Sequence, residues 1–328
     1  MVHLRVPHAT STVHVLELLP GVPIFFMISG FLVSGSWDRS LGLRDYAFRR
    51  SLRIFPGLWC CVLVSIVTFV VFGDIQIKVV RFAVWLGAQL SIGQFYNPAF
   101  LRGYGVGALN GSLWTIPVEL QFYIVLPLIF GIFTSKRKRH WVFASAAFLI
   151  AATANRFYYM HHSMNEGLAE KLLGVTLLPH IYFFLLGVVA YGLRKRLLPL
   201  VYNRWVWWLG IYCASAWLLA EAGASVRGNG ISPLLAPLLG LMVLSGAYSK
   251  PMLARRILGQ NDISYGTYIY HMLIINVLVE IGFISSWTSF WVALLGTILI
   301  ATLSWVLVER PSLALKRRFA APSPSGAL

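Results

Sequence analysis

The chain has 328 residues, of which 58% are hydrophobic and only 12% are charged. An ordinary soluble domain has roughly 25% charged residues, so this composition excludes a soluble globular protein and predicts a membrane protein. The formal net charge of +16 could indicate nucleic-acid binding, but the basic residues stand in short clusters between apolar runs, which is typical of cytoplasmic loops. We therefore expect no nucleic-acid partner.

Nine apolar runs are long enough to cross a bilayer, which takes about 17 to 25 helical residues. They cover residues 16–36, 52–73, 113–133, 141–157, 172–193, 205–221, 231–248, 265–284 and 287–308. A further run, 79–93, is shorter and carries Arg81, so we interpret it as an interfacial or re-entrant helix. The predicted fold is all-α, a polytopic membrane helical bundle of nine spans. It forms one domain, residues 1–318, with a disordered cytoplasmic tail, 319–328.

The basic residues also predict an orientation. Alternate connections, counted with the adjoining ends of the runs and with the C-terminal tail, carry 20 lysines and arginines on one side and 6 on the other. The positive-inside rule places the first set, and with it the C-terminus, in the cytoplasm. Met1 then lies near the outer face.

The cysteines give no sign of a disulfide framework or a metal centre. Cys60, Cys61 and Cys213 lie inside apolar runs and have no cysteine or histidine partner at metal-ligand spacing. We expect buried thiols and no metal site.

Two segments near the start of the chain carry small or basic residues. Ser29 and Gly30 lie within an apolar run, where small residues let another helix approach closely. Arg50 and Arg53 are three residues apart and share a helix face at the cytoplasmic end of a span. They are either membrane anchors that extend to the interface, or a clamp for phosphate oxygens, which arginine binds bidentately.

The segment from Asn110 to Tyr123 places a carboxylate at membrane depth. Pro117 fits a first helical turn, and Glu119 then lies just inside the span, with Tyr123 on the same face four residues later. A helix N-terminus tolerates a carboxylate, which is the structural interpretation. Because an ionisable group inside the membrane costs about 2.5–3.5 kcal/mol, we favour a functional role for Glu119.

The segment from Ser264 to His271 places Tyr268 and His271 on one helix face near the cytoplasmic side. A hydrogen-bonded core histidine is the alternative to a functional one. Glu309 closes the last span before Arg310-Pro311, where it could pair with a neighbouring basic residue.

Taken together, these segments resemble the acyltransferase-3 family of bacterial membrane proteins. The shared features are FF-x-x-SGF, R-x-x-R-I-x-P, N-x-S-L-W-T-x-x-V-E-x-x-F-Y, S-Y-G-x-Y-x-x-H and V-E-R-P, in the family's order. The resemblance implies ten spans in the bacterial inner membrane. It also implies transfer of an acyl group, commonly acetyl from acetyl-CoA, to hydroxyls of surface glycans, lipid-linked sugars or exported small molecules.

In that family the first helix carries an arginine, ten further residues, and then a histidine proposed to be catalytic. His3 stands where that histidine would be, and no arginine can lie eleven residues before it. We therefore expect a truncated first helix, completed by an upstream start that adds roughly 15–20 residues. His8 and His14 are rival candidates.

The resemblance and the predicted orientation together assign roles. His3 would act as general base on the acceptor hydroxyl, and Glu119 would hold its imidazole. Arg50, Arg53, Tyr265 and His271 would bind the cytoplasmic acyl-CoA, which is a co-substrate, with no bound cofactor and no metal. The supporting residues would be Ser29, Gly30, Trp114, Tyr123, Ser264, Tyr268 and Glu309. The expected partners are acyl-CoA, a glycan or lipid-linked sugar, and membrane lipids. A glycan transporter or flippase, and an inactive membrane scaffold, are the alternative functions.

Overall fold

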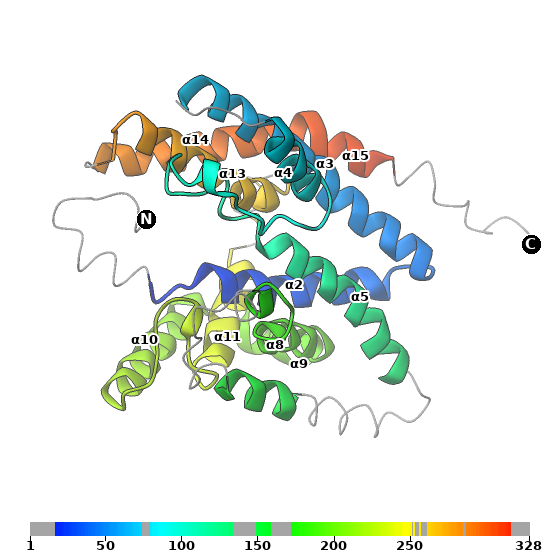
Figure 1. The fold of residues 1–328 in the computed structure, drawn as a ribbon. Helices are drawn as coiled ribbons and strands as arrows, with labels where there is room; N and C mark the ends of the chain where they lie inside the picture. Colours follow the sequence, from blue (N-terminus) through cyan, green and yellow to red (C-terminus); the bar gives the residue numbers. More distant parts are fainter. Residues whose placement is uncertain are drawn as a thin grey trace, which may run out of the picture. The chain divides into compact units, whose positions relative to one another are not determined.

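The structure is a computed structural model that describes residues 17–73, 79–133, 149–158, 172–250, 252, 256, 261–284 and 287–315. Over these residues the chain is helical and contains no strand, and Figure 1 labels the helices. The chain divides into two compact units. The first takes its described residues from Ser40–Ile116 and Gln260–Leu328, and the second from Ala9–Arg39 and Pro117–Gly259.

The first unit is built around three long helical stretches. Its elements are α3 (Leu43–Phe72), α4 (Val79–Leu90), the short η1 (Ala99–Leu101), α13 (Ser264–Glu280), α14 (Trp287–Ser304), the π-helical turn η3 (Trp305–Glu309) and α15 (Arg310–Ala314). Helix α13 packs against both α14 and α3. The turn η3 continues α14 directly into α15, so Trp287–Ala314 forms one helical stretch.

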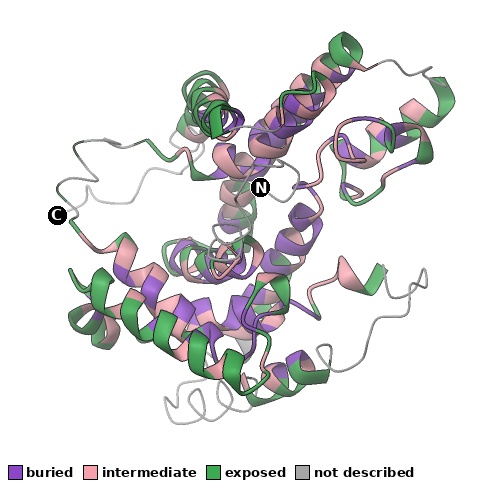
Figure 2. Ribbon diagram, turned by 90° about the vertical axis from the view of Figure 1, so that its left-hand side faces the viewer, coloured by how far each residue is buried: buried purple, intermediate pink, exposed green. Residues whose placement is uncertain are grey.

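Helix α14 shows why these elements pack as they do. Its buried side carries the small residues Ser289, Ala293, Thr297 and Ala301, spaced four apart, while Leu299 on another face is 61% exposed. Small residues turned inward and leucines turned outward are typical of a helix surrounded by lipid rather than water. In Figure 2 the exposed and buried faces of the helices are drawn in green and purple.

The second unit contains α2 (Gly21–Asp38), α5 (Thr115–Phe133), α8 (Ile181–Gly192), α9 (Arg194–Val201), α10 (Trp205–Glu221), η2 (Gly228–Gly230) and α11 (Ala236–Ala247). The first two residues of α5 are assigned to the first unit and the rest of the helix to the second. Helix α2 lies along α8, and α10 packs against α11.

Three helical stretches of the described chain are long and apolar enough to cross a membrane: Gly21–Asp38, Leu43–Phe72 and Trp287–Ala314. Helices α8 and α11 have 12 residues each, fewer than the roughly 17 that a span requires. The count of nine spans therefore stays a prediction. The predicted span 141–157 and the tail 319–328 lie partly or wholly outside the described residues.

One boundary differs clearly from the sequence prediction. The predicted spans end at residue 36 and begin again at residue 52, yet α3 already begins at Leu43 and includes Arg44, Arg49 and Arg50. The reason is local: Asp45 occupies the first helical turn and forms an ion pair of 2.6 Å with Arg49, four residues later. An acidic residue in the first turn and an i,i+4 ion pair both stabilise a helix start.

Candidate active site

The pair Ser29-Gly30 lies where α2 and α8 make their closest approach. A Cβ atom added to Gly30 would stand 2.0 Å from the carbonyl oxygen of Phe184, and one added to Gly187 would stand 2.0 Å from the carbonyl oxygen of Met27. Each helix therefore needs glycine opposite the other backbone. This agrees with the packing interpretation of Gly30.

Ser29, one residue earlier, faces a different helix. Its hydroxyl donates a hydrogen bond of 3.1 Å to Oε1 of Glu119 on α5. The same carboxylate oxygen accepts a hydrogen bond of 2.6 Å from the hydroxyl of Tyr123, one turn further along α5. Glu119 is only 7% exposed. The structure thus joins three of the predicted residues, Ser29, Glu119 and Tyr123, in one buried polar cluster.

Aromatic side chains on the same two helices, α2 and α5, pack together with Phe184 of α8 and His180. Phe122, the residue before Tyr123, stacks on Phe184 at 4.2 Å between ring centroids and meets Phe26 edge-on at 5.2 Å. His180, which precedes α8, lies 5.0 Å from the Phe26 ring. A carboxylate in such apolar surroundings interacts strongly with any proton donor that reaches it, because little water screens the interaction. The cluster can therefore orient a hydroxyl or an imidazole.

A second cluster forms in the first unit around Arg53. Its guanidinium pairs with Asp262 at 2.7 Å and with Glu309 at 3.4 Å. It also lies over the rings of Tyr265 at 5.6 Å and Trp305 at 5.8 Å. The two carboxylates differ in exposure: the Glu309 side chain is 1% exposed and that of Asp262 is 51% exposed. Arg53 is therefore anchored on its buried side and open to exchange on its exposed side.

The helices around Arg53 fit tightly. Tyr265 is buried, and its hydroxyl donates a hydrogen bond of 3.0 Å to the carbonyl of Ile54 on α3. A Cβ on Gly57 would lie 2.8 Å from the Tyr265 ring. Glu309 is the last residue of the π-helical turn η3 and accepts a hydrogen bond of 3.2 Å from the hydroxyl of Ser304. π-helical turns occur frequently at functional sites.

The remaining predicted residues occupy other places in the first unit. Ser264 donates to Asp262 through its backbone N–H and its hydroxyl, which fixes the start of α13. Arg50 is half-buried on α3, one turn before Arg53. Trp114 immediately precedes α5 and is also half-buried.

His271 does not join Arg53. It lies six residues after Tyr265 on α13, or about 9 Å along the helix axis. Its Nδ1 donates a hydrogen bond of 2.6 Å to the carbonyl of Tyr268, so the ring carries a proton on Nδ1. Tyr268 shares a hydrogen bond of 2.7 Å with Thr115. The expected donor-binding set is therefore split along α13.

Sequence reasoning missed Asp262, His180 and Arg156. Arg156 is 6% exposed, donates to the carbonyls of Asn229 and Ile231, and lies 5.0 Å from the Phe183 ring. It lies at the end of the predicted span 141–157, and an arginine in that position could have been recognised as buried. His180 and Asp262 gave no such signal.

The proposed base cannot be placed. His3 and its rivals His8 and His14 lie outside the described residues. Within the described ranges, no group of three histidine, cysteine or carboxylate side chains could hold a metal ion.

Comparison with known proteins identifies the family. A family model described as an acyltransferase domain matches residues 17–309. Nodulation protein 10 of Rhizobium leguminosarum bv. viciae is 34% identical over 329 residues, covering 96% of this chain and 88% of the relative. The O-acetyl transferase of Shigella phage Sf6 is 26% identical, covering 88% of this chain and 83% of the relative.

Peptidoglycan O-acetyltransferase OatA of Listeria monocytogenes is 27% identical over 34% of this chain and 20% of the relative. No solved structure is significantly similar to the chain. Because the family match covers most of the chain and includes both buried clusters, the chain belongs to the acyltransferase-3 family of membrane proteins, and it is an acyltransferase that transfers groups other than amino-acyl groups.

Proposed function

We propose that the protein is a membrane-embedded O-acyltransferase that moves acetyl from acetyl-CoA to a hydroxyl of a surface or lipid-linked glycan. The observation that carries the proposal is the buried cluster of Glu119, Ser29 and Tyr123 inside an acyltransferase family match. The names of two relatives support the acetyl group and the glycan acceptor: one relative is named O-acetyl transferase and another is named peptidoglycan O-acetyltransferase.

The reaction forms a bond between the acceptor oxygen and the acyl carbon and breaks the thioester C–S bond. The acceptor hydroxyl loses its proton to a base, and coenzyme A leaves as the thiol after protonation. His3 is the proposed base. Glu119, fixed by two hydroxyl donors on one oxygen, would hold the imidazole and stabilise its cation. The histidine would therefore act in one tautomer at the moment of transfer.

In this proposal the Arg53 cluster binds the acyl donor, acetyl-CoA. Glu309 anchors the guanidinium from the buried side, and the more exposed Asp262 occupies the position that a phosphate oxygen of acetyl-CoA would take. Arginine binds phosphate through paired N–H donors. Arg50 and Tyr265 belong to the same proposed donor site, and His271 would belong to a part of it further along α13.

The proposed location is the bacterial inner membrane, with several spans and a cytoplasmic C-terminus. The asymmetric distribution of basic residues along the chain supports this orientation. It would place the donor end on the side where acetyl-CoA is made.

The proposal is tested with the purified full-length protein in nanodiscs and radiolabelled acetyl-CoA. We expect release of coenzyme A and transfer of label to a glycan fraction from cells that carry the gene. Mass spectrometry of envelope glycans from cells with and without the gene should differ by one acetyl mass per modified sugar. Absence of both acetyl-CoA turnover and a glycan difference would contradict the proposed function.

A further inference from the structure

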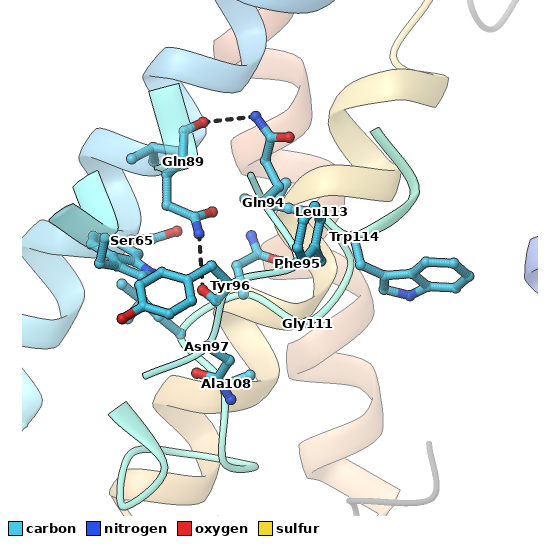
Figure 3. A pocket seen from close by; sticks show the side chains of 14 residues that line it. Ser65, Gln89, Gln94, Phe95, Tyr96, Asn97, Ala108, Gly111, Leu113 and Trp114 are labelled. Carbon is cyan, nitrogen blue, oxygen red and sulfur yellow. Dashed lines mark hydrogen bonds between the residues drawn. The ribbon is translucent and has the colours of Figure 1, made fainter. Parts of the chain in front are cut away.

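The first unit contains a pocket that neither buried cluster uses. It lies between α3, α4, the segment 94–97 and the segment 108–114, and its volume is about 190 Å³. Figure 3 shows the lining side chains, with Gln89, Gln94 and Tyr96 connected by hydrogen bonds at one end. All of its lining residues belong to the same compact unit.

The lining is polar but carries no charge. None of the 14 lining residues is aspartate, glutamate, lysine or arginine. The side chains that matter for recognition are the amides Gln89, Gln94 and Asn97 and the aromatic residues Trp85, Phe95 and Tyr96. Sites for a phosphate or a carboxylate usually supply cationic side chains, so this lining favours a neutral ligand over an anionic one.

Gln94 points to a ligand that donates hydrogen bonds. The residue is 5% exposed, and its Nε2 donates hydrogen bonds of 2.8 Å to the backbone carbonyls of both Gln89 and Ser91. These two bonds fix which end of the amide is nitrogen. Its Oε1 is buried and has no hydrogen-bond partner among the described residues. Buried carbonyl oxygens are almost always paired, so this one can accept a hydrogen bond from a donor that enters the pocket, either a ligand or a water molecule.

The aromatic residues narrow the ligand class further. Phe95 and Tyr96 are 41% and 40% exposed, whereas Trp85 is 4% exposed. Exposed rings next to buried amides match the two kinds of surface on a sugar ring: its C–H face packs on an aromatic ring, and its hydroxyls donate to amide oxygens. A hydrocarbon chain would cover the rings but leave Gln94 Oε1 unpaired.

Size and position also fit an acceptor sugar. The volume is smaller than the roughly 300–1,000 Å³ typical of pockets for drug-sized molecules, which suits one ring rather than an oligosaccharide. The lining ends with Trp114, directly before α5. The segment 74–112 is also the connection that the charge pattern predicts on the outer side of the membrane.

We infer that this pocket binds one neutral sugar ring of the acceptor glycan, through its exposed aromatic rings and the unpaired amide oxygen of Gln94. The inference rests on the proposed function, whose acceptor it specifies as an uncharged sugar. Gln94 and Tyr96 are the specificity-determining residues of this subsite.

Saturation-transfer NMR on the full-length protein in nanodiscs tests the inference, with methyl β-glucoside as the neutral probe and methyl β-glucuronide as its charged counterpart. We expect transfer to the glucoside and much weaker transfer to the glucuronide. Tyr96→Ala, at an exposed position, should weaken glucoside binding roughly two- to ten-fold, the scale of one lost aromatic contact. Gln94→Met should also weaken it. The matched control is Tyr202→Ala, since Tyr202 is 50% exposed in the second unit, and it should bind as the wild type does.

The outcomes separate this inference from the proposed function. Acetyl-CoA turnover without glucoside binding, or with equal binding in Tyr96→Ala and Tyr202→Ala, would overturn the sugar subsite and leave the acyltransferase proposal standing. Glucoside binding that depends on Tyr96 and Gln94, in a protein that never consumes acetyl-CoA, would support the subsite while the acyltransferase proposal fails. Equal transfer to glucoside and glucuronide would overturn the neutral-sugar assignment.

Discussion

At the scale of single residues, the protein keeps two buried carboxylates in different surroundings. Glu119 accepts hydrogen bonds from the hydroxyls of Ser29 and Tyr123, while Glu309 pairs with Arg53 and accepts from Ser304. A hydroxyl that donates a hydrogen bond to a carboxylate stabilises it without bringing an opposite charge. A carboxylate that is paired with arginine is largely neutralised. The first arrangement suits chemistry, and the second suits the anchoring of a cation.

This difference makes Glu119→Gln the sharpest residue test. Glutamine keeps the shape and can still accept from Tyr123, so expression and thermal stability should stay near wild type. Loss of the negative charge should lower acyl transfer by about 10²-fold or more, the scale of an acid–base contribution. The measurement is label transfer from acetyl-CoA, with Glu221→Gln, an exposed position on α10, as control. Full activity in Glu119→Gln would leave the carboxylate as a structural feature of the helix start.

The Arg53 cluster predicts opposite effects for two substitutions. Arg53→Ala should raise the KM for acetyl-CoA, and added salt should raise it further, because the lost interaction is between charges. Asp262→Asn should lower this KM, since it removes the exposed carboxylate that competes with a phosphate for the guanidinium. Arg39→Ala, at the C-terminal end of α2, is the control for a simple loss of positive charge.

Stability must be measured beside these kinetics. Arg53→Ala leaves Glu309 buried without its cation, and breaking a buried pair in this way costs about 3–5 kcal/mol. The double variant Arg53→Ala, Glu309→Gln should recover the thermal stability but not the KM. If stability and KM recover together, Arg53 holds the helices together and does not bind the donor.

At the scale of elements, close backbone contact decides which helices meet. Gly30 and Gly187 let α2 and α8 approach until each backbone touches the other, and this fixes Ser29 opposite Glu119. In lipid, such contact replaces the hydrophobic effect as the source of specificity. The polar cluster therefore depends on two glycines that do no chemistry.

Gly30→Ala should damage the protein through packing alone. The added methyl group would lie 2.0 Å from the carbonyl oxygen of Phe184, so the helices must separate, and overpacking of this kind costs about 1–3 kcal/mol. We expect a melting temperature lower by several degrees and a loss of transfer activity. Gly210→Ala is the matched control, because Gly210 lies inside α10 with nothing within 4 Å of an added Cβ. It should melt at the same temperature or slightly higher, since alanine favours a helix. Equal melting of the two variants would contradict the close-packing role.

The sequence predicted the features that depend on neighbouring residues, such as helix bounds and residues on one helix face. It did not predict contacts between residues that are far apart in the chain. The predicted span 205–221 coincides with α10, and the spacing of Glu119 and Tyr123 correctly placed them on one face. Ser29 could not be matched to Glu119, because 90 residues separate them and only the packing of α2 and α5 brings them together. Asp262 was missed for the same reason, since its partner Arg53 is 209 residues away.

At the scale of the whole molecule, the surface composition is that of a membrane protein. Large apolar side chains such as Leu63, Val67 and Leu299 are more than half exposed, which water would penalise and lipid accommodates. The three longest apolar stretches agree with this. The sidedness of the remaining segments rests on the asymmetric distribution of lysine and arginine along the chain.

That asymmetry makes a prediction which requires no knowledge of the substrate. Ser91 lies after α4 in a connection with few basic residues, and Lys195 lies at the start of α9 in a basic one; both are exposed. In a background whose three cysteines are replaced by alanine, a membrane-impermeant maleimide should label Ser91→Cys in intact spheroplasts, in which the inner membrane is sealed. It should label Lys195→Cys only after permeabilisation, because the positive-inside rule keeps the basic connection in the cytoplasm. Labelling of both positions after permeabilisation confirms that each cysteine is reachable.

If Lys195→Cys reacts in intact spheroplasts and Ser91→Cys does not, the orientation is inverted. The Arg53 cluster would then lie away from the acetyl-CoA pool, and the proposed direction of acyl transfer would have to be abandoned.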